Sequence, residues 1–246
     1  MIDFSKFKIE VHTNRITPVV QDNPALCYIH DRDTDELFVK LFYDDVEIAQ
    51  GIILDFYKEF TNIETNGIQE TQIKTFPFHD RTKQKYTNFG NKIYQIKYLQ
   101  NPPIPQQQRM HYIAEFTNAI NHYLPSLKEI NESLKITFVP SNTKTPDDIA
   151  TSLGNLSSLD LANIISKNSQ SVANSKNILD FNTSIQYAQK KYIVDTAYLE
   201  SHKGTKYIVV DDVFGNGSSM LTVMKKLYDT NHMLNYFFIV VKDVKR

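Results

Sequence analysis

The residues with the clearest chemical potential fall in one short stretch, KYIVVDDVFGNGSSM, at positions 206 to 220. An apolar run ends at the paired carboxylates Asp211 and Asp212, and a turn containing Gly215 and Gly217 then leads into two serines. Backbone N–H groups in a glycine turn and at the start of a helix bind anions. Carboxylates bind hydroxyls directly or through Mg²⁺. The stretch therefore predicts a ligand with a phosphate at one end and hydroxyls nearby, such as a sugar phosphate.

The spacing of the glycines excludes the common nucleotide-binding loops. GxxxxGK[ST] is absent, and Gly215 and Gly217 do not form GxGxxG. A plain strand-turn-helix connection, with an Asp cap and glycine at the turn, is the alternative interpretation. The order of apolar strand, two acids, Gly-x-Gly and Ser-Ser favours a phosphate site. Its predicted residues are Phe214, Gly215, Asn216, Gly217, Ser218 and Ser219.

The elements before this stretch suggest two regions, divided at the proline-rich segment NPPIPQQQ (101–108). Residues 1–105 form a β-rich N-terminal region, since KFKIEVH, ELFVKLFY and TQIKTFPF alternate with period 2. Within it, VEIAQGIILDFYKEF (46–60) has helical spacing and predicts a helix, while NKIYQIKYLQ (91–100) fits a strand or a helix.

Residues 106–246 predict an α/β domain in which strands alternate with helices around a mainly parallel sheet. A helix over 109–124 precedes the strand ITFVP, and Thr145-Pro146-Asp147-Asp148 is typical of a helix start. Helical spacing continues through SLDLANIISK, with a break or bend near Gly154. The polar residues 166–189 predict a long loop that covers the site.

The motif VVDDVFGNGSSM resembles the phosphoribosyl-pyrophosphate (PRPP) motif of type I phosphoribosyltransferases. The resemblance implies that Asp211 and Asp212 hold the ribose 2- and 3-hydroxyls and that Gly215 to Ser219 surround the 5-phosphate. The commonest family version has threonines at two positions that are Gly215 and Asn216 here, and a third threonine where this chain has Ser219. Two hydroxyl donors are therefore missing, whereas backbone phosphate binding is retained.

Other segments carry the same resemblance. ITFVPSNTKT is similar to the first core strand and the pyrophosphate loop, which would comprise Ser141, Asn142, Thr143 and Lys144. The layout is nearest to ComF-type phosphoribosyltransferase-like proteins, with IYQIKYL before the helix and a loop cover containing Thr183, Gln186, Lys190 and Lys191. The resemblance covers about residues 90 to 246 and lacks the Cys-rich zinc module that many ComF-type proteins carry.

By this resemblance, a nucleophile would displace pyrophosphate from C1 of PRPP through an oxocarbenium-like state. Asp211, Asp212 and Lys144 would be the catalytic residues, with Mg²⁺ near the two aspartates through ribose or water. A degenerate module that senses a nucleotide or sugar phosphate is a second hypothesis, with the N-terminal region engaging a protein partner. Phosphoribosyltransferase-like effectors of stress and phage-defence systems, including retrons, are the analogy for that module. A third hypothesis is a hydrolase or nucleotide-depleting toxin that uses the same pocket with water as the acceptor.

Composition limits the partners. The 27 basic and 28 acidic side chains give no net field for nucleic acid or a membrane surface. No apolar run approaches the roughly 18 residues that span a bilayer, and the start lacks a secretory pattern, which predicts a cytoplasmic protein. The histidines lack metal-ligand spacing, and the single Cys27 excludes an internal disulfide. Lys97 and Arg109 are interpreted as a solvated basic face, and Tyr187 as a residue that could stack on a base.

Overall fold

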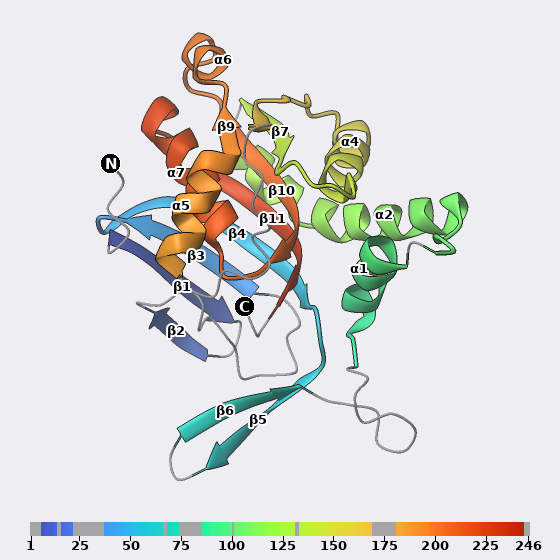
Figure 1. The fold of residues 1–246 in the computed structure, drawn as a ribbon. Coiled ribbons are helices and arrows are strands. Elements are labelled where there is room, and N and C mark those ends of the chain that lie inside the picture. Colours follow the sequence, from blue (N-terminus) through green and yellow to red (C-terminus); the bar gives the residue numbers. More distant parts are fainter. Residues whose placement is uncertain are drawn as a thin grey trace.

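The main element of the fold is a seven-stranded sheet with the order β2-β1-β3-β4-β11-β10-β7 (Figure 1). The computed structural model describes residues 6–13, 16–21, 37–65, 68–73, 85–99, 101–130, 133–168 and 181–243, and the statements below concern these residues. The strands of this sheet are β1 (Phe7–Thr13), β2 (Ile16–Gln21), β3 (Leu37–Tyr43), β4 (Val46–Phe56), β7 (Leu134–Phe138), β10 (Lys206–Phe214) and β11 (Asn235–Lys242).

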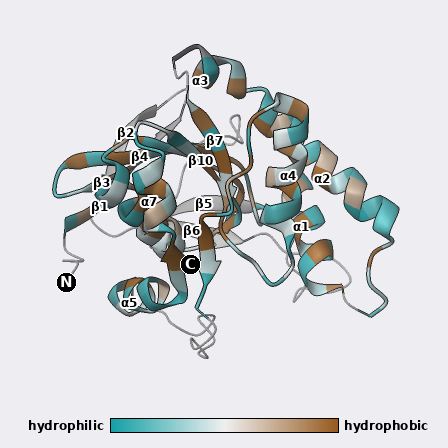
Figure 2. Cartoon of the chain, turned by 90° about the horizontal axis from the view of Figure 1, so that it is seen from above, coloured by the Kyte–Doolittle hydropathy of each residue, from teal (hydrophilic) through white to brown (hydrophobic). Residues whose placement is uncertain are grey.

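Helices cover both faces of the sheet, which gives three layers (Figure 2). The helices are α1 (Asn88–Tyr98), α2 (Gln106–Asn121), α3 (Leu124–Ile130), α4 (Thr145–Ser157), α5 (Phe181–Lys191), α6 (Thr196–Ser201) and α7 (Ser218–Asn231). One apolar cluster packs the sheet against α5 and α7, and a second packs the opposite face against α1, α2 and α4. A strand covered on both faces is apolar at successive positions, as in the brown strands β7 and β10 of Figure 2.

The pairing of the strands brings four carboxyl ends to one edge. β10 pairs in parallel with β11 and with β7, and β11 pairs in parallel with β4. β3, β1 and β2 extend the sheet with antiparallel pairs. This confirms the predicted α/β class with parallel strands, flanking helices and a β-rich N-terminal region. In open sheets of this kind, ligands bind beyond the carboxyl ends of the strands. Strands from both sides of residue 105 share the sheet; the division into 1–105 and 106–246 stays a prediction.

The helix predicted for residues 46–60 is wrong, because most of this segment is strand β4. The strand lies between β3 and β11, with Ile53 in one apolar cluster and Ile52 and Leu54 in the other. Burial on both faces removes the period-2 alternation that marks a half-buried strand. The consecutive apolar residues then produced an accidental helical spacing.

The long loop and the helix before it also differ from the prediction. Residues 181–189 of the predicted loop belong to helix α5, while residues 169–180 lie outside the described residues. Helix α4 is unbroken at Gly154 and ends at Ser157, where Ser158 caps it with a left-handed backbone (φ 58°). SLDLANIISK is therefore not helical, and the chain continues to β8 (Ile165–Lys167), which pairs with β9 (Tyr192–Val194).

Residues 91–100 and the segment that follows β4 also have defined structures. Residues 91–100, which fitted a strand or a helix, belong mainly to α1. The hairpin β5 (Phe60–Thr65) and β6 (Ile68–Ile73) forms its own two-stranded sheet, which projects beyond the main sheet in Figure 1. Among the described residues, no helix combines the length and apolar character needed to cross a bilayer.

Candidate functional site

The two predicted carboxylates lie side by side near the end of the central strand β10. Asp211 and Asp212 are 9% and 3% exposed, and the strand continues past them to Phe214. The backbone N–H of Asp212 donates to Asp211 Oδ1 (2.8 Å). Since β7 and β11 lie on either side of β10, the two aspartates are near the carboxyl ends of the parallel strands. We call these two residues the acid pair.

A lysine that the sequence interpretation placed on a solvated face is the partner of the acid pair. Lys97 Nζ of α1 lies 2.8 Å from Asp212 Oδ1, and the two side chains are 20% and 5% exposed. Burial acts to lower the pKa of Lys97, but the Asp212 carboxylate, its hydrogen bond and the nearby Asp211 outweigh it and raise the pKa. Lys97 is therefore a cation inside the site. Its position in IYQIKYL was the available signal, because that segment carried part of the family resemblance.

Asp211 and the second carboxyl oxygen of Asp212 lie in unfavourable surroundings for a negative charge. Burial, followed by the charge of Asp212, raises the pKa of Asp211 above the usual carboxyl range, while Lys97 and Lys191 act against this. Asp212 Oδ2 is buried and has no hydrogen-bond partner among the described residues. A buried carboxylate oxygen without a partner is costly. The acid pair can thus accept further hydrogen bonds, and the hydroxyl groups of a ligand that reaches it could donate them.

The predicted phosphate loop begins directly after the acid pair. Gly217 has a left-handed backbone (φ 82°) and caps α7 without a side-chain hydrogen bond. Asn216 Oδ1 accepts from the Ser218 N–H (3.1 Å). A Cβ at Gly217 would lie 2.8 Å from the Phe214 ring and 3.2 Å from Ile9 Cδ1. Glycine is thus required both by the backbone conformation and by the packing of β1 beneath the loop.

A buried lysine supports the same loop from below. Lys242 is fully buried and donates to the carbonyl oxygens of Gly215 (2.7 Å) and Asp243 (2.8 Å). Its ammonium lies 5.5 Å from the centre of the Phe214 ring. Phe214, predicted as part of the phosphate site, is buried, and its carbonyl accepts from the Asp243 N–H (3.0 Å). Its side chain therefore belongs to the support of the loop.

The predicted pyrophosphate loop follows β7 and has an internal hydroxyl network. Ser141 Oγ lies 3.1 Å from Thr143 Oγ1, which lies 3.0 Å from Thr145 Oγ1. Lys144 is exposed, has a left-handed backbone (φ 56°) and caps α4. Arg109 Nη2 donates to the carbonyl oxygen of Thr143 (2.9 Å). Arg109, interpreted as part of a solvated face, therefore supports this loop.

Lys167 of β8 is a second cation that the sequence interpretation missed. Its Nζ donates to Asn142 Oδ1 of the pyrophosphate loop (2.6 Å). Burial, followed by Lys191, lowers the pKa of Lys167, while Asp211 and Asp212 act to raise it. Lys167 therefore contacts the pyrophosphate loop directly and interacts electrostatically with both aspartates of the acid pair. The sequence does not single it out, because β8 is only three residues long and lies where the predicted helical segment (158–167) and the predicted loop (166–189) meet.

The predicted cover residues lie on α5 and differ in their exposure and in their effect on the acid pair. Thr183, Gln186 and Lys190 are exposed. The Lys191 ammonium lies 4.8 Å from the centre of the Tyr192 ring and 5.8 Å from that of Tyr187, and its charge acts on Asp211. Ser219 Oγ of α7 is 3.5 Å from the Tyr192 hydroxyl. Of the four predicted cover residues, Lys191 is thus the one with an electrostatic effect on the acid pair.

The donor set limits how a metal could be held. No group of three or more His, Cys, Asp or Glu side chains suitable for a metal occurs in the described part of the chain. Mg²⁺ needs only one or two carboxylates when substrate phosphates and water complete its shell. At the acid pair, however, Asp212 Oδ1 is paired with Lys97 and Asp212 Oδ2 is buried. Direct coordination of Mg²⁺ by Asp212 therefore requires Lys97 to move.

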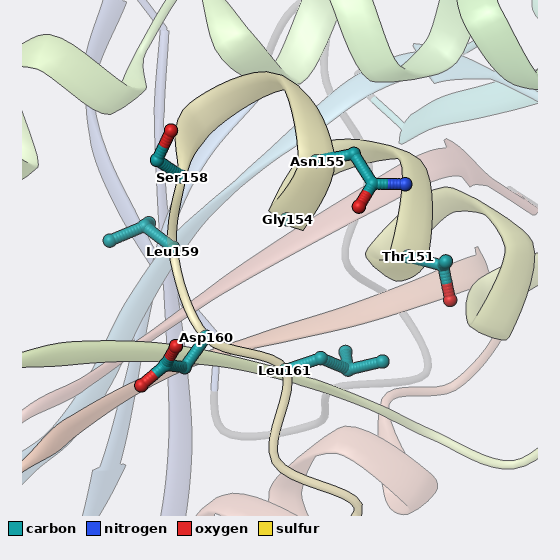
Figure 3. Close-up of a pocket in the computed structure, with 7 residues that line it drawn as sticks. All are labelled: Thr151, Gly154, Asn155, Ser158, Leu159, Asp160 and Leu161. Atoms are coloured by element: carbon teal, nitrogen blue, oxygen red, sulfur yellow. The ribbon is translucent and has the colours of Figure 1, made fainter.

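A separate pocket of about 460 Å³ lies at the C-terminal end of α4 (Figure 3). Its lining residues are Thr151, Gly154, Asn155, Ser158, Leu159, Asp160 and Leu161. None belongs to the acid pair, the phosphate loop or the pyrophosphate loop. The polar groups that converge at the carboxyl ends of β7 and β10, rather than this pocket, define the candidate site.

The sequence matches no protein-family model and no curated protein. The function proposed below therefore rests on the residues and geometry of the site.

Proposed function

We propose that this protein is a phosphoribosyltransferase-like protein that binds PRPP or a related ribose phosphate at the acid pair and the loop after β10. The single observation that carries the proposal is the continuity of these two parts. Asp211 and Asp212 lie near the end of a buried parallel strand, and Gly217 then turns the chain into α7 without a side-chain cap. The helix N-terminus favours a phosphate, and the carboxylates favour the ribose hydroxyls.

In the proposed reaction, a nucleophile forms a bond to ribose C1 while the bond from C1 to the pyrophosphate oxygen breaks. The electron pair of that bond leaves with pyrophosphate. Lys144 in the pyrophosphate loop and Lys167, hydrogen-bonded to Asn142, would offset the charge of the leaving group. Mg²⁺, if carried in by the pyrophosphate, would add to that charge compensation. Transfer to a base or cleavage by water would use the same positioning.

Isothermal titration calorimetry with PRPP and Mg²⁺ tests the binding proposal. We expect wild-type protein to bind and the double variant Asp211→Asn, Asp212→Asn to bind at least about tenfold more weakly, because the negative charge of the acid pair and its carboxyl acceptors for the ribose hydroxyls are lost. Asp160→Asn is a control, since Asp160 is exposed and pairs with Lys135. Failure of wild type to bind PRPP or ribose 5-phosphate would contradict the proposal.

A degenerate sensing module or a toxin effector is the second candidate. One observation favours it: Gly215 and Asn216 stand where the family resemblance has threonine hydroxyls. A protein partner at the N-terminal region and a cytoplasmic location remain parts of this proposal. Binding of PRPP without pyrophosphate release in a screen of acceptor bases would favour sensing. Loss of cellular nucleotides on expression, absent from the double aspartate variant, would favour the toxin.

A further inference from the structure

We propose that the Lys97 ammonium is the resident cation of the acid pair, occupying the position in which Asp212 would otherwise coordinate a divalent metal directly. The apo site is then closed to divalent cations, and a ribose phosphate binds there without one. The statement about metal ions depends only on the geometry of the apo protein. The statement about the ligand rests on the function proposed above.

The position of Lys97 is fixed by contacts at the other end of α1. Asp55, near the end of β4, accepts from the Phe89 N–H through Oδ2 (3.0 Å). Thr87 caps the helix by accepting from the Gly90 N–H (3.0 Å). A Cβ at Gly90 would collide with the Tyr57 carbonyl oxygen, so glycine allows α1 to lie against the chain after β4. Two turns further along, the helix brings Lys97 to Asp212.

The charges around the acid pair leave little demand for a second cation. Two adjacent buried carboxyl groups repel each other when both are ionised, and each negative charge then needs compensation. Lys97 forms the direct contact with Asp212, and its charge also acts on Asp211. Lys191 acts on Asp211 as well, and Lys167 is within electrostatic reach of both acids. A divalent ion added next to Lys97 would meet like charge, whereas an incoming phosphate would not.

Burial distinguishes this pair from an ordinary surface contact. The side chains of Lys97 and Asp212 are 20% and 5% exposed, whereas those of Lys6 and Asp44 are 40% and 59% exposed. Asp212 Oδ2, in addition, is buried without a hydrogen-bond partner among the described residues. Removal of the ammonium would therefore leave a buried carboxylate without its direct counter-charge and would free Asp212 Oδ1, which is a favourable setting for a hard cation.

Binding of Mn²⁺ to the protein without ligand, followed by electron paramagnetic resonance, tests the metal statement. We expect no site-specific binding to wild type and a new site in Lys97→Met, at least about tenfold tighter than any binding to wild type. Lys97→Arg, which keeps a cation, should resemble wild type. Lys92→Met is the matched control, because Lys92 is on the same helix and pairs with Glu115 instead.

The wild-type measurement decides the matter even if Lys97→Met does not fold. Stoichiometric Mn²⁺ binding to wild type that Asp212→Asn abolishes would overturn the proposal. So would a correctly folded Lys97→Met variant that binds Mn²⁺ no better than Lys92→Met.

Calorimetry with ribose 5-phosphate, in EDTA and in Mg²⁺, tests the ligand statement. This probe has ribose hydroxyls and one phosphate but no pyrophosphate to bring its own metal. We expect wild-type affinity to differ by less than about threefold between the two conditions. Binding that requires Mg²⁺ would contradict the role of Lys97 while supporting the proposed function. Absence of binding in both conditions would contradict the proposed function and the ligand statement, while the Mn²⁺ result would still decide the metal statement.

Discussion

Lys97 and Asp212 are 115 positions apart in the chain, yet their side chains form a buried ion pair with an N–O distance of 2.8 Å. This contact joins α1, on one face of the sheet, to the central strand β10. A lysine from the segment before residue 105 therefore acts electrostatically on a candidate site whose motif lies after residue 205. The ion pair therefore connects α1 to the candidate site.

Breaking this pair should destabilise the protein strongly. We expect Lys97→Met or Asp212→Asn alone to lower the free energy of unfolding by about 3 kcal/mol, because each leaves a buried group without its partner. The double variant should lose much less than the sum. Urea unfolding of the four proteins in a double-mutant cycle measures the coupling. Because the pKa of Lys97 is raised, the coupling should persist at neutral pH and decline only at strongly alkaline pH.

A matched surface pair provides the control for this cycle. Lys6 and Asp44 also form an ion pair at 2.8 Å, but both side chains are exposed. Their coupling should be about 0.5 kcal/mol. Equal coupling energies for the two pairs would show that burial does not strengthen the contact between Lys97 and Asp212.

The buried Asp211 should make stability depend on pH. Because its pKa in the folded protein is raised, the folded state holds this proton to a higher pH than the unfolded state does. Stability therefore falls as pH rises above the ordinary carboxyl value of about 3.9 and stops falling above the raised pKa, at up to about 1.4 kcal/mol per pH unit. Asp211→Asn should remove this decline. Thermal unfolding from pH 5 to pH 8 measures it, and parallel pH profiles of the variant and wild type would refute the prediction.

Gly217 should tolerate alanine poorly for two separable reasons. Its positive φ is unfavourable for any side chain, and an added Cβ would also meet the Phe214 ring at 2.8 Å. Gly204 has nearly the same φ (84°) but no atom within 4 Å of an added Cβ. We expect Gly204→Ala to cost about 1 kcal/mol and Gly217→Ala about 2 to 3 kcal/mol, with loss of phosphate binding only in the latter. Chemical unfolding and phosphate titration of both variants distinguish the backbone contribution from the packing contribution. Equal losses of unfolding free energy in the two variants would show that the contact with the Phe214 ring contributes nothing.

Lys242 should position the phosphate loop without contacting the ligand. Replacement by Met removes hydrogen bonds to the carbonyl oxygens of Gly215 and Asp243. We expect ribose 5-phosphate affinity to fall about tenfold with an unchanged dependence on salt, because no ligand-facing charge is lost. A loss of affinity that vanishes at high salt would instead indicate direct contact with the phosphate. Calorimetry at two salt concentrations provides the comparison.

The sequence predicts the central unit of the fold well because its signals are local. Strand β10, the glycine turn, helix α7 and strand β11 follow one another within 37 residues, from Lys206 to Lys242, and each has its own pattern. The strand, the two adjacent acids and the glycine turn into a helix are therefore predictable from the sequence, while their role as a phosphate site stays a prediction. Strand β4 was mistaken for a helix because both of its faces are covered, which removes the alternation that a strand signal requires.

The cations of the site could not be assigned from the sequence for a different reason. Lys97 and Lys167 acquire their roles from partners far along the chain, Asp212 and Asn142. A lysine on an isolated helix or short strand looks like any solvated residue. Lys144, chosen for its place in a loop resembling the pyrophosphate loop, is exposed, whereas Lys167 contacts that loop directly.

The most direct test of the central claim is a crystal structure of the wild-type protein with ribose 5-phosphate. The account predicts phosphate density against the backbone from Gly215 to Ser219, with the ribose 2- and 3-hydroxyls directed at Asp211 and Asp212. An empty loop at saturating ligand, or ligand density only in the pocket at the end of α4, would contradict it.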